Sequence, residues 1–189
     1  MTEHDAQTIR RILKVNHAGE HGAIRIYAVQ SVVARFTAPD IVANLIEMKA
    51  HEIEHHMNFA EAMPQRLAKP CRLLFLWAWG GFLLGLATAL CGKRMIWICT
   101  EAVESAVHDH LNNQLRFLQH CDPSLFNLIA AIKTEEESHL HFAQEGRGPD
   151  TVVSRFAVSL IGWVTDVLIW MSTSGDSSRL KVALKNYQQ

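Results

Sequence analysis

Apolar residues recur every three or four positions in four long stretches of the chain, a spacing that predicts amphipathic helices. The predicted helices cover residues 8–36, about 40–63, 95–119 and about 124–145. Pro39 and Pro123 suit the first turn of a helix, and Gly-Arg-Gly-Pro at 146–149 ends the fourth one. The pattern therefore predicts an all-α protein built on a bundle of four helices.

Charged groups interrupt the apolar stripe of each predicted helix. The first and third helices carry a single glutamate there, and the second and fourth carry the pattern Glu-x-x-His, which occurs twice in the chain. These residues are Glu20, Glu52 with His55, Glu104, and Glu136 with His139. Residues three apart share one face of a helix. The offset in sequence between the two single glutamates equals the offset between the two Glu-x-x-His motifs, so the chain consists of two similar halves.

This set of side chains is typical of a metal site. A single Glu-x-x-His is more often a surface feature than a ligand pair, but four buried carboxylates without partners would each cost several kcal/mol. Two divalent cations would balance their charge. Ferritin-like four-helix bundles bind two metal ions with this inventory, and oxygen-rich ligation with one imidazole per ion suits iron or manganese better than structural zinc. We therefore predict a di-iron carboxylate site held by these six residues. Tyr27, on the same face as Glu20, is either a hydrogen-bonding neighbour of the site or a core tyrosine.

Two other stretches, 73–91 and 151–171, are apolar almost throughout. The first contains no charge and, at 19 residues, is long enough to be a transmembrane candidate. If it crossed a bilayer, the two Glu-x-x-His motifs would lie on opposite sides and could not form one site. We therefore expect a long crossover helix whose outer face dips into the membrane surface, and an extra C-terminal apolar helix at 151–171. Residues 172–189 are expected to form a polar linker and then a short amphipathic helix or a frayed tail.

The composition and the absence of certain motifs argue against some classes of function. The net charge of −1 gives no electrostatic reason to expect a nucleic-acid partner. The four cysteines form no C-x-x-C pair, which favours reduced thiols in the cytosol, and the polar N-terminus does not resemble a targeting peptide. The chain contains no G-x-G-x-x-G motif and no P-loop, so we expect no nucleotide site and an external electron donor. We expect one domain over 1–189, with the bundle core at 8–145, in a bacterial cell.

Several motifs resemble those of one protein family. They are Val15-Asn16-His17-Ala18-Gly19-Glu20-His21-Gly22-Ala23, Arg25-Ile26-Tyr27, Met48-Lys49, Trp77, Gly81-Phe82, Gly85, Thr88-Ala89-Leu90, Gly92-Lys93, Cys99-Thr100, Ala102-Val103-Glu104 and Asn112-Asn113-Gln114. Together with the two Glu-x-x-His motifs, they make residues 9–145 resemble the 5-demethoxyubiquinone hydroxylases of ubiquinone biosynthesis, which are ferritin-like.

The resemblance implies a monooxygenase that uses two iron ions and O2 to hydroxylate the ring of a membrane-dissolved demethoxyubiquinone. It implies a peripheral or monotopic protein on the cytoplasmic face of the bacterial inner membrane. Its partners would be the membrane surface, an electron donor, and possible further copies or other ubiquinone-biosynthesis proteins. The family's ligands fall on the same six residues, and His110 matches a family histidine near the site.

The chain departs from the family pattern at three places. Ser105 stands where the family usually has a second glutamate, and Leu111 where it usually has tyrosine. The family's usual Tyr-Leu-Ser-Glu-Arg sequence is replaced by Trp170-Met171-Ser172-Thr173. None of these changes removes a predicted ligand. Two other functions use the same features: a ferritin-like iron-handling ferroxidase, which has no need of two apolar outer helices, and a non-catalytic quinone-binding scaffold, which would hold no metal.

Overall fold

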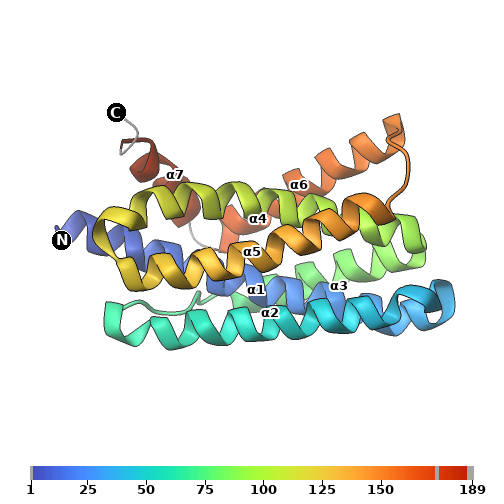
Figure 1. Ribbon diagram of the computed structural model, residues 1–189, viewed down its shortest axis with the longest axis horizontal. Helices are drawn as coiled ribbons and strands as arrows, with labels where there is room; N and C mark the ends of the chain where they lie inside the picture. Colours follow the sequence, from blue (N-terminus) through green and yellow to red (C-terminus); the bar gives the residue numbers. More distant parts are fainter. Residues whose placement is uncertain (1, 173–174, 187–189) are drawn as a thin grey trace.

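The computed structural model describes residues 2–172 and 175–186, and in this part of the chain the regular elements are all helices, with no β-strand (Figure 1). Its elements are α1 (Glu3–Thr37), η1 (Pro39–Ile41), α2 (Val42–Ala62), η2 (Pro64–Arg66), α3 (Leu74–Leu90), α4 (Lys93–Cys121), α5 (Pro123–Gly146), α6 (Val152–Ser172) and α7 (Asp176–Asn186). The predicted all-α fold is confirmed, and six helices follow the order and approximate bounds expected from the sequence.

Local capping interactions explain where two of these helices begin. α1 starts before the predicted position because Thr2 and Asp5 form a capping box, in which each side chain accepts a hydrogen bond from the other's backbone N–H, at 3.1 and 2.7 Å. α5 starts at Pro123 because Asp122 accepts from the backbone N–H of Leu125 at 2.9 Å. The same carboxylate binds the guanidinium of Arg66, which ties η2 to the turn between α4 and α5.

The helices are arranged in three layers. α1 packs between α2 and α3, and α4 packs between α5 and α6. Contacts of α2 with α5, α1 with α4, and α3 with α6 join these two sets into one body. From α1 to α6 each helix runs opposite to the one before it, so that α3 carries the chain back along the bundle before α4 (Figure 1). α3 is therefore the predicted crossover, and α2 and α4 run in the same direction, as in ferritin-like bundles.

The repeat seen in the sequence extends to whole helices. The offset between the ends of α1 and α4, at Thr37 and Cys121, equals the offset between the ends of α2 and α5, at Ala62 and Gly146. It is also the offset that separates the two Glu-x-x-His motifs. In the layered arrangement α6 takes the place in the second half that α3 takes in the first. The fold is thus a duplicated unit of three helices.

Glycines hold α3 closely against α1. A Cβ atom on Gly81 would lie 2.4 Å from the carbonyl oxygen of Gly22, and one on Gly85 would lie 2.7 Å from the carbonyl oxygen of Ile26. A larger residue at either position would have to push the two backbones apart. The opposite face of α3 exposes apolar side chains such as Trp79 and Leu83.

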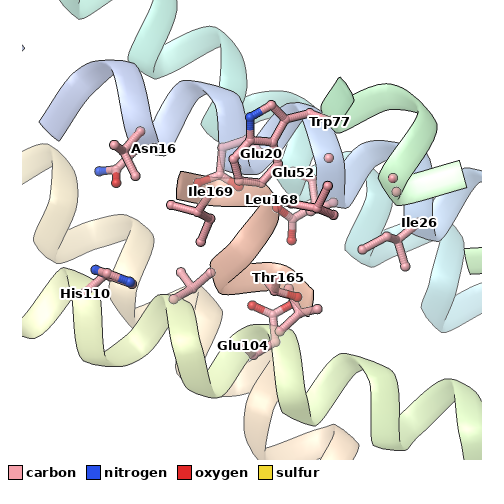
Figure 2. Close-up of a pocket in the computed structure, with 18 of the residues that line it drawn as sticks. Asn16, Glu20, Ile26, Glu52, Trp77, Glu104, His110, Thr165, Leu168 and Ile169 are labelled. Atoms are coloured by element: carbon pink, nitrogen blue, oxygen red, sulfur yellow. The ribbon is translucent and has the colours of Figure 1, made fainter. Parts of the chain in front are cut away.

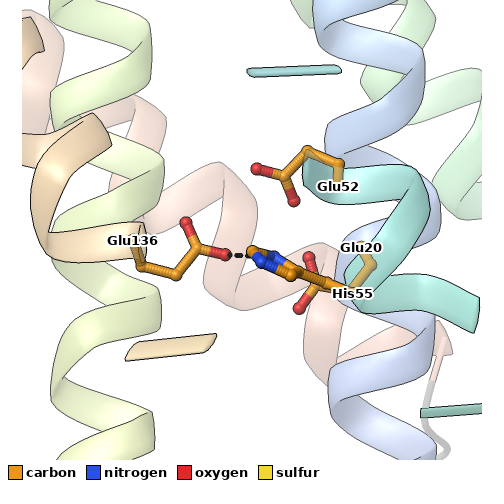
Figure 3. Close-up of side chains that lie close together, drawn as sticks. All are labelled: Glu20, Glu52, His55 and Glu136. Carbon is orange, nitrogen blue, oxygen red and sulfur yellow. Dashed lines mark hydrogen bonds and ion pairs between the residues drawn. The ribbon is translucent and has the colours of Figure 1, made fainter. Parts of the chain in front are cut away.

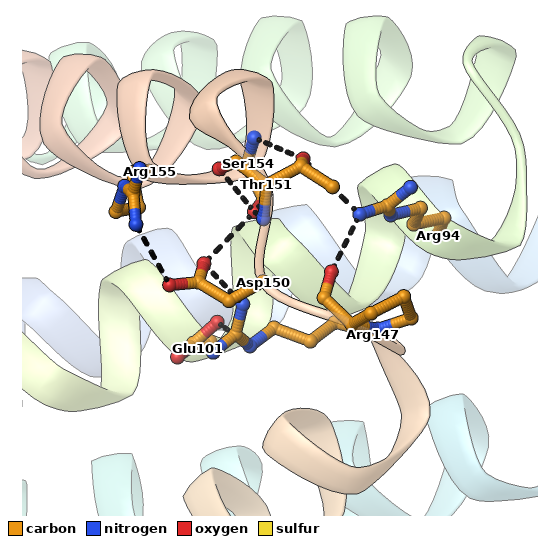
Figure 4. A network of polar contacts seen from close by, with 8 residues as sticks. Arg94, Glu101, Arg147, Asp150, Thr151, Ser154 and Arg155 are labelled. Carbon is orange, nitrogen blue, oxygen red and sulfur yellow. Dashed lines mark hydrogen bonds and ion pairs between the residues drawn. The ribbon is translucent and has the colours of Figure 1, made fainter.

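α6 is attached through a polar network at its beginning (Figure 4). Arg147 forms salt bridges with Glu101 at 2.7 Å and with Asp150 at 3.1 Å. Thr151 and Ser154 cap the first turn with reciprocal backbone-to-side-chain hydrogen bonds. These contacts fix the chain where it turns from α5 back along α4.

Length and composition would allow one stretch of the described residues to cross a membrane, Ser154–Met171 within α6; α3, at 17 residues, is shorter. α7 packs differently, because Leu180 and Leu184 are buried in the core cluster that includes Ile9 and Leu118. The amphipathic-helix alternative for the C-terminal segment therefore holds over Asp176–Asn186. The parts of that segment at 173–174 and 187–189 lie outside the described residues.

Candidate metal centre

The fold brings the six predicted ligands together in the middle of the bundle. Glu20 lies on α1, Glu52 and His55 on α2, Glu104 on α4, and Glu136 and His139 on α5. All six are buried, with between 1 % and 6 % of each residue exposed. They are carried by the four central helices because each sits on the apolar stripe that its helix turns toward the core.

Two overlapping groups of these side chains could each hold a metal ion. One consists of Glu20, Glu52, His55 and Glu136 (Figure 3), and the other of Glu52, Glu104, Glu136 and His139. Within each group the potential ligand atoms all lie within 4.8 Å of one another. Glu52 and Glu136 belong to both groups, so the arrangement offers two adjacent ion positions that share two carboxylates.

The two histidines contact the shared carboxylates directly. His55 Nδ1 lies 3.1 Å from Glu136 Oε1, and His139 Nδ1 lies 3.2 Å from Glu136 Oε2 and 3.6 Å from Glu52 Oε1. Yet Glu52 Oε1, Glu136 Oε2 and His139 Nδ1 are buried without a properly oriented hydrogen bond to any described residue. Buried polar atoms usually have a partner, so these three have the position and chemistry of metal ligands.

In the metal-free form, the pKa values of several clustered groups are shifted from their usual values. Burial, followed by repulsion from neighbouring carboxylates, raises the pKa of Glu20 and of Glu104 well above the usual value. Burial alone would lower the pKa of His55 and His139, but the adjacent carboxylates, chiefly Glu136, outweigh it and raise the pKa of both to about 9. Glu136, next to both imidazoles, has a lowered pKa despite its burial. Divalent cations would take the place of these protons, because metal ligands must be deprotonated.

Three further residues support the cluster from outside. The hydroxyl of Tyr27 donates to Glu104 Oε1 at 2.5 Å, so the predicted neighbour of the site is in contact with it. Glu135 Oε2 lies 3.0 Å from His55 Nε2, and His51 Nδ1 lies 2.9 Å from His139 Nε2. Partners of this kind fix the orientation of a ligating histidine. The sequence pattern did not single out His51 or Glu135, although each stands directly before a motif glutamate, at equivalent positions of the two halves.

A cavity of about 70 Å³ leads to the cluster between α1, α3, α4 and α6 (Figure 2). The carboxylates of Glu20, Glu52, Glu104 and Glu136 contribute to its wall, which is otherwise mostly apolar. His110, the other predicted neighbour, lines it from α4. Other lining residues are Val15, Asn16, Gly19, Gly22, Ala23, Ile26, Trp77, Gly80, Gly81, Leu84, Val103, Val107, Leu111, Thr165, Leu168 and Ile169. A mostly apolar wall beside a few carboxylates is typical of a site for an apolar molecule.

A duplicated helical bundle with four glutamates and two histidines at its centre defines a ferritin-like protein with a buried carboxylate–histidine cluster able to bind metal. Within that class, the chain belongs to the family described as Ubiquinone biosynthesis protein COQ7, which it matches over residues 7–172. The family membership indicated by the sequence motifs is thereby confirmed.

Individual relatives agree with this assignment. The chain is 34 % identical to the "NADPH-dependent 3-demethoxyubiquinone 3-hydroxylase, mitochondrial" of Dictyostelium discoideum over 170 residues, covering 88 % of the chain and 77 % of the relative. It is 41 % identical over 135 residues to the human protein of the same name, covering 69 % and 61 %. It is 38 % identical over 135 residues to the "3-demethoxyubiquinol 3-hydroxylase" of Rhodospirillum rubrum, covering 71 % and 63 %. The matches to the human and bacterial relatives thus span about three fifths of those proteins.

Proposed function

We propose that the protein is a di-iron monooxygenase that uses O2 to hydroxylate the ring of demethoxyubiquinone in ubiquinone biosynthesis. The observation that carries this proposal is a mostly apolar cavity whose wall includes four of the six clustered side chains. An apolar substrate placed there would have its ring beside the metal positions. The names of the relatives supply the substrate and the reaction.

The six clustered residues would hold the two iron ions. Glu20 and His55 would bind one ion, Glu104 and His139 the other, and the shared Glu52 and Glu136 would bind both. The iron would supply the activation of O2 and the transfer of an oxygen atom to the ring. The protein's own part is to fix the ligands, as Tyr27 does for Glu104, and to keep bulk water away from the reacting atoms.

The outer face of α3 and α6 is the proposed contact with the membrane. Apolar side chains are exposed along both helices, namely Phe75, Trp79, Phe82, Leu83, Leu90, Phe156, Leu160, Trp163, Trp170 and Met171. A quinone with a long isoprenoid tail is nearly insoluble in water and must be collected from a bilayer. α3 and α6 also form part of the cavity wall, so the same two helices can meet the membrane and admit the substrate.

We place the protein on the cytoplasmic face of a bacterial inner membrane without a span, and we infer that an external donor supplies the electrons. Lys69 and Lys93 flank α3, and protease and labelling experiments on membrane vesicles should find both on the same side. If the two lysines were on opposite sides, the membrane arrangement and the metal site would both be wrong. Further copies or other ubiquinone-biosynthesis proteins are the remaining proposed partners.

Quinone analysis in a deletion strain tests the function. Cells that lack the protein should accumulate demethoxyubiquinone, and the gene should restore ubiquinone. Glu104→Ala should abolish this rescue because it removes a clustered carboxylate, whereas Glu54→Ala, an exposed glutamate of α2, should rescue normally. Unchanged quinone content in the deletion strain would refute the proposed substrate, and iron analysis of anaerobically purified protein would then show whether the metal assignment survives.

A further inference from the structure

The two halves of the protein differ at the position where the cavity forms. In the first half, Gly81 of α3 lies against the backbone of α1 and leaves no space between the helices. The residue at the equivalent position of the second half, in helix α6, is Thr165, and Gly85 corresponds in the same way to Ile169. These larger residues line the cavity together with Val103 and Glu104 of α4. The cavity lies between the two halves, with Gly80 and Gly81 on the side of α3 and Thr165 and Ile169 on the side of α6.

Thr165 is also unusual within its own helix. The inward face of α6 is apolar around the cavity, with Ile161, Leu168 and Ile169 buried or partly buried, while Trp163 points outward and is exposed. A helix that exposes a tryptophan and directs a threonine inward reverses the usual arrangement. Figure 2 shows the Thr165 side chain in the cavity, beside Glu104.

The hydroxyl of Thr165 has no hydrogen bond to any of the described residues. A hydroxyl that lines the cavity without a partner can donate a hydrogen bond to an oxygen of a bound ligand. Of the other polar wall residues outside the carboxylates, Asn16 is already satisfied: its amide exchanges two hydrogen bonds with Gln114, at 2.8 and 2.9 Å. Thr165 is thus available to a ligand in a way that Asn16 is not.

A close contact with α3 fixes the position of this hydroxyl. A Cβ atom on Gly80 would lie 2.8 Å from Cδ1 of Leu168, so the leucine side chain fits against the glycine. Leu168 lies about one turn after Thr165 on the same helix. The contact sets how α6 lies along α3, and so where Thr165 points.

We propose that Thr165 positions the substrate by donating a hydrogen bond from its hydroxyl to a ring oxygen of the quinone. The inference rests on the proposed function and adds a residue outside the metal cluster to it. A quinone ring carries oxygen acceptors and no donor, so a threonine hydroxyl is a suitable partner for it. The bond would hold the ring in one orientation next to the metal positions and so determine which ring carbon faces them.

Ligand binding to the anaerobic, iron-loaded protein tests this role. Thr165→Val removes the hydroxyl and keeps the shape, Thr165→Ser keeps the hydroxyl, and Ser159→Val is the matched control on the exposed side of α6. The probes are a short-tailed methoxyquinone and an alkylbenzene of similar size without ring oxygens. Quenching of tryptophan fluorescence can report binding, because Trp77 lines the cavity.

Thr165→Val should weaken quinone binding by about 3- to 10-fold, the effect of one lost hydrogen bond, and leave binding of the alkylbenzene unchanged. Thr165→Ser and Ser159→Val should bind the quinone as the wild type does. In turnover with the quinone substrate, Thr165→Val should also raise KM and yield a less selective position of hydroxylation.

Three results would overturn the inference: unchanged quinone binding in Thr165→Val, equal weakening for both probes, or a loss of iron in that variant. Equal weakening would mean that the side chain acts by packing, and loss of iron would mean that it acts through Glu104. If the wild-type protein bound no quinone, the proposed function would fail, and this inference with it.

Discussion

The hydrogen bond from Tyr27 to Glu104 makes the two metal positions unequal. The residue equivalent to Tyr27 in the second half is Leu111, which has no hydroxyl to offer to Glu20. Burial, and then the charge of Glu104, raises the pKa of Tyr27 well above its usual value, so the phenol stays protonated and can donate at neutral pH. We therefore predict that Tyr27→Phe selectively weakens the ion position that contains Glu104.

The size of the effect follows from the type of hydrogen bond. A bond to a charged group contributes about 1.5–3 kcal/mol, and loss of a residue that orients a metal ligand typically lowers metal affinity about 10- to 100-fold. We expect one of the two dissociation constants for Fe²⁺ to rise by about that factor in Tyr27→Phe and the other to stay close to the wild-type value.

Anaerobic iron titration in competition with a chelator measures both constants. Leu111→Tyr is the reciprocal variant: Leu111 lines the cavity, and the added hydroxyl should strengthen the position that contains Glu20. Thermal unfolding of the metal-free variants checks that the fold is retained. If Tyr27→Phe left both constants within twofold of the wild type, or weakened them equally, the inequality of the two positions would be disproved.

Three other predictions concern the cluster and the scaffold. Glu52→Ala and Glu136→Ala should each reduce iron well below two ions per chain, because each carboxylate belongs to both groups; full iron in both variants, by elemental analysis, would contradict the shared-ligand arrangement. The pKa values of His55 and His139 in the metal-free fold, about 9, lie above the ordinary 6.5. The protonated histidines therefore stabilise the metal-free fold fully below about pH 6.5, and this stabilisation is lost as the pH rises through 9. The urea midpoint of the metal-free protein should fall over that pH range. Asp122→Ala removes a helix cap and a salt bridge to η2 and should cost about 2 kcal/mol, a fall in Tm of about 4–8 °C by calorimetry.

The sequence predicts the gathering of the six side chains well because helical periodicity fixes the face on which each lies. Glu20 and Glu104 could be assigned to the same region as the Glu-x-x-His motifs since all of them interrupt apolar stripes, and the fold places them together. The contacts of His51 and Glu135 with the histidines could not be predicted, because they depend on how α2 and α5 face each other. A spacing along one helix does not contain that information.

The cavity could not be predicted from the sequence pattern either. It depends on the difference in packing between α3 on α1 and α6 on α4, which the hydrophobic pattern of a single helix does not reveal. Gly81 and Thr165 would have pointed to this difference only after the two apolar stretches were recognised as equivalent. The apolar character of the two stretches predicts only that both are helices.

Because the fold is duplicated, metal ions bound at the cluster would link the two halves of the chain. Each ion position takes three side chains from one half of the chain and one carboxylate from the other: Glu136 completes the first group and Glu52 the second. Without metal, four carboxylates face each other across the boundary between the halves, and the raised pKa values of Glu20 and Glu104 favour the protonated form of these two. Bound metal ions would join carboxylates of the two halves and so hold the halves together. A protein divided at Gly92, between α3 and α4, would thus consist of two fragments that iron draws together, so that metal uptake and assembly of the fold are one event.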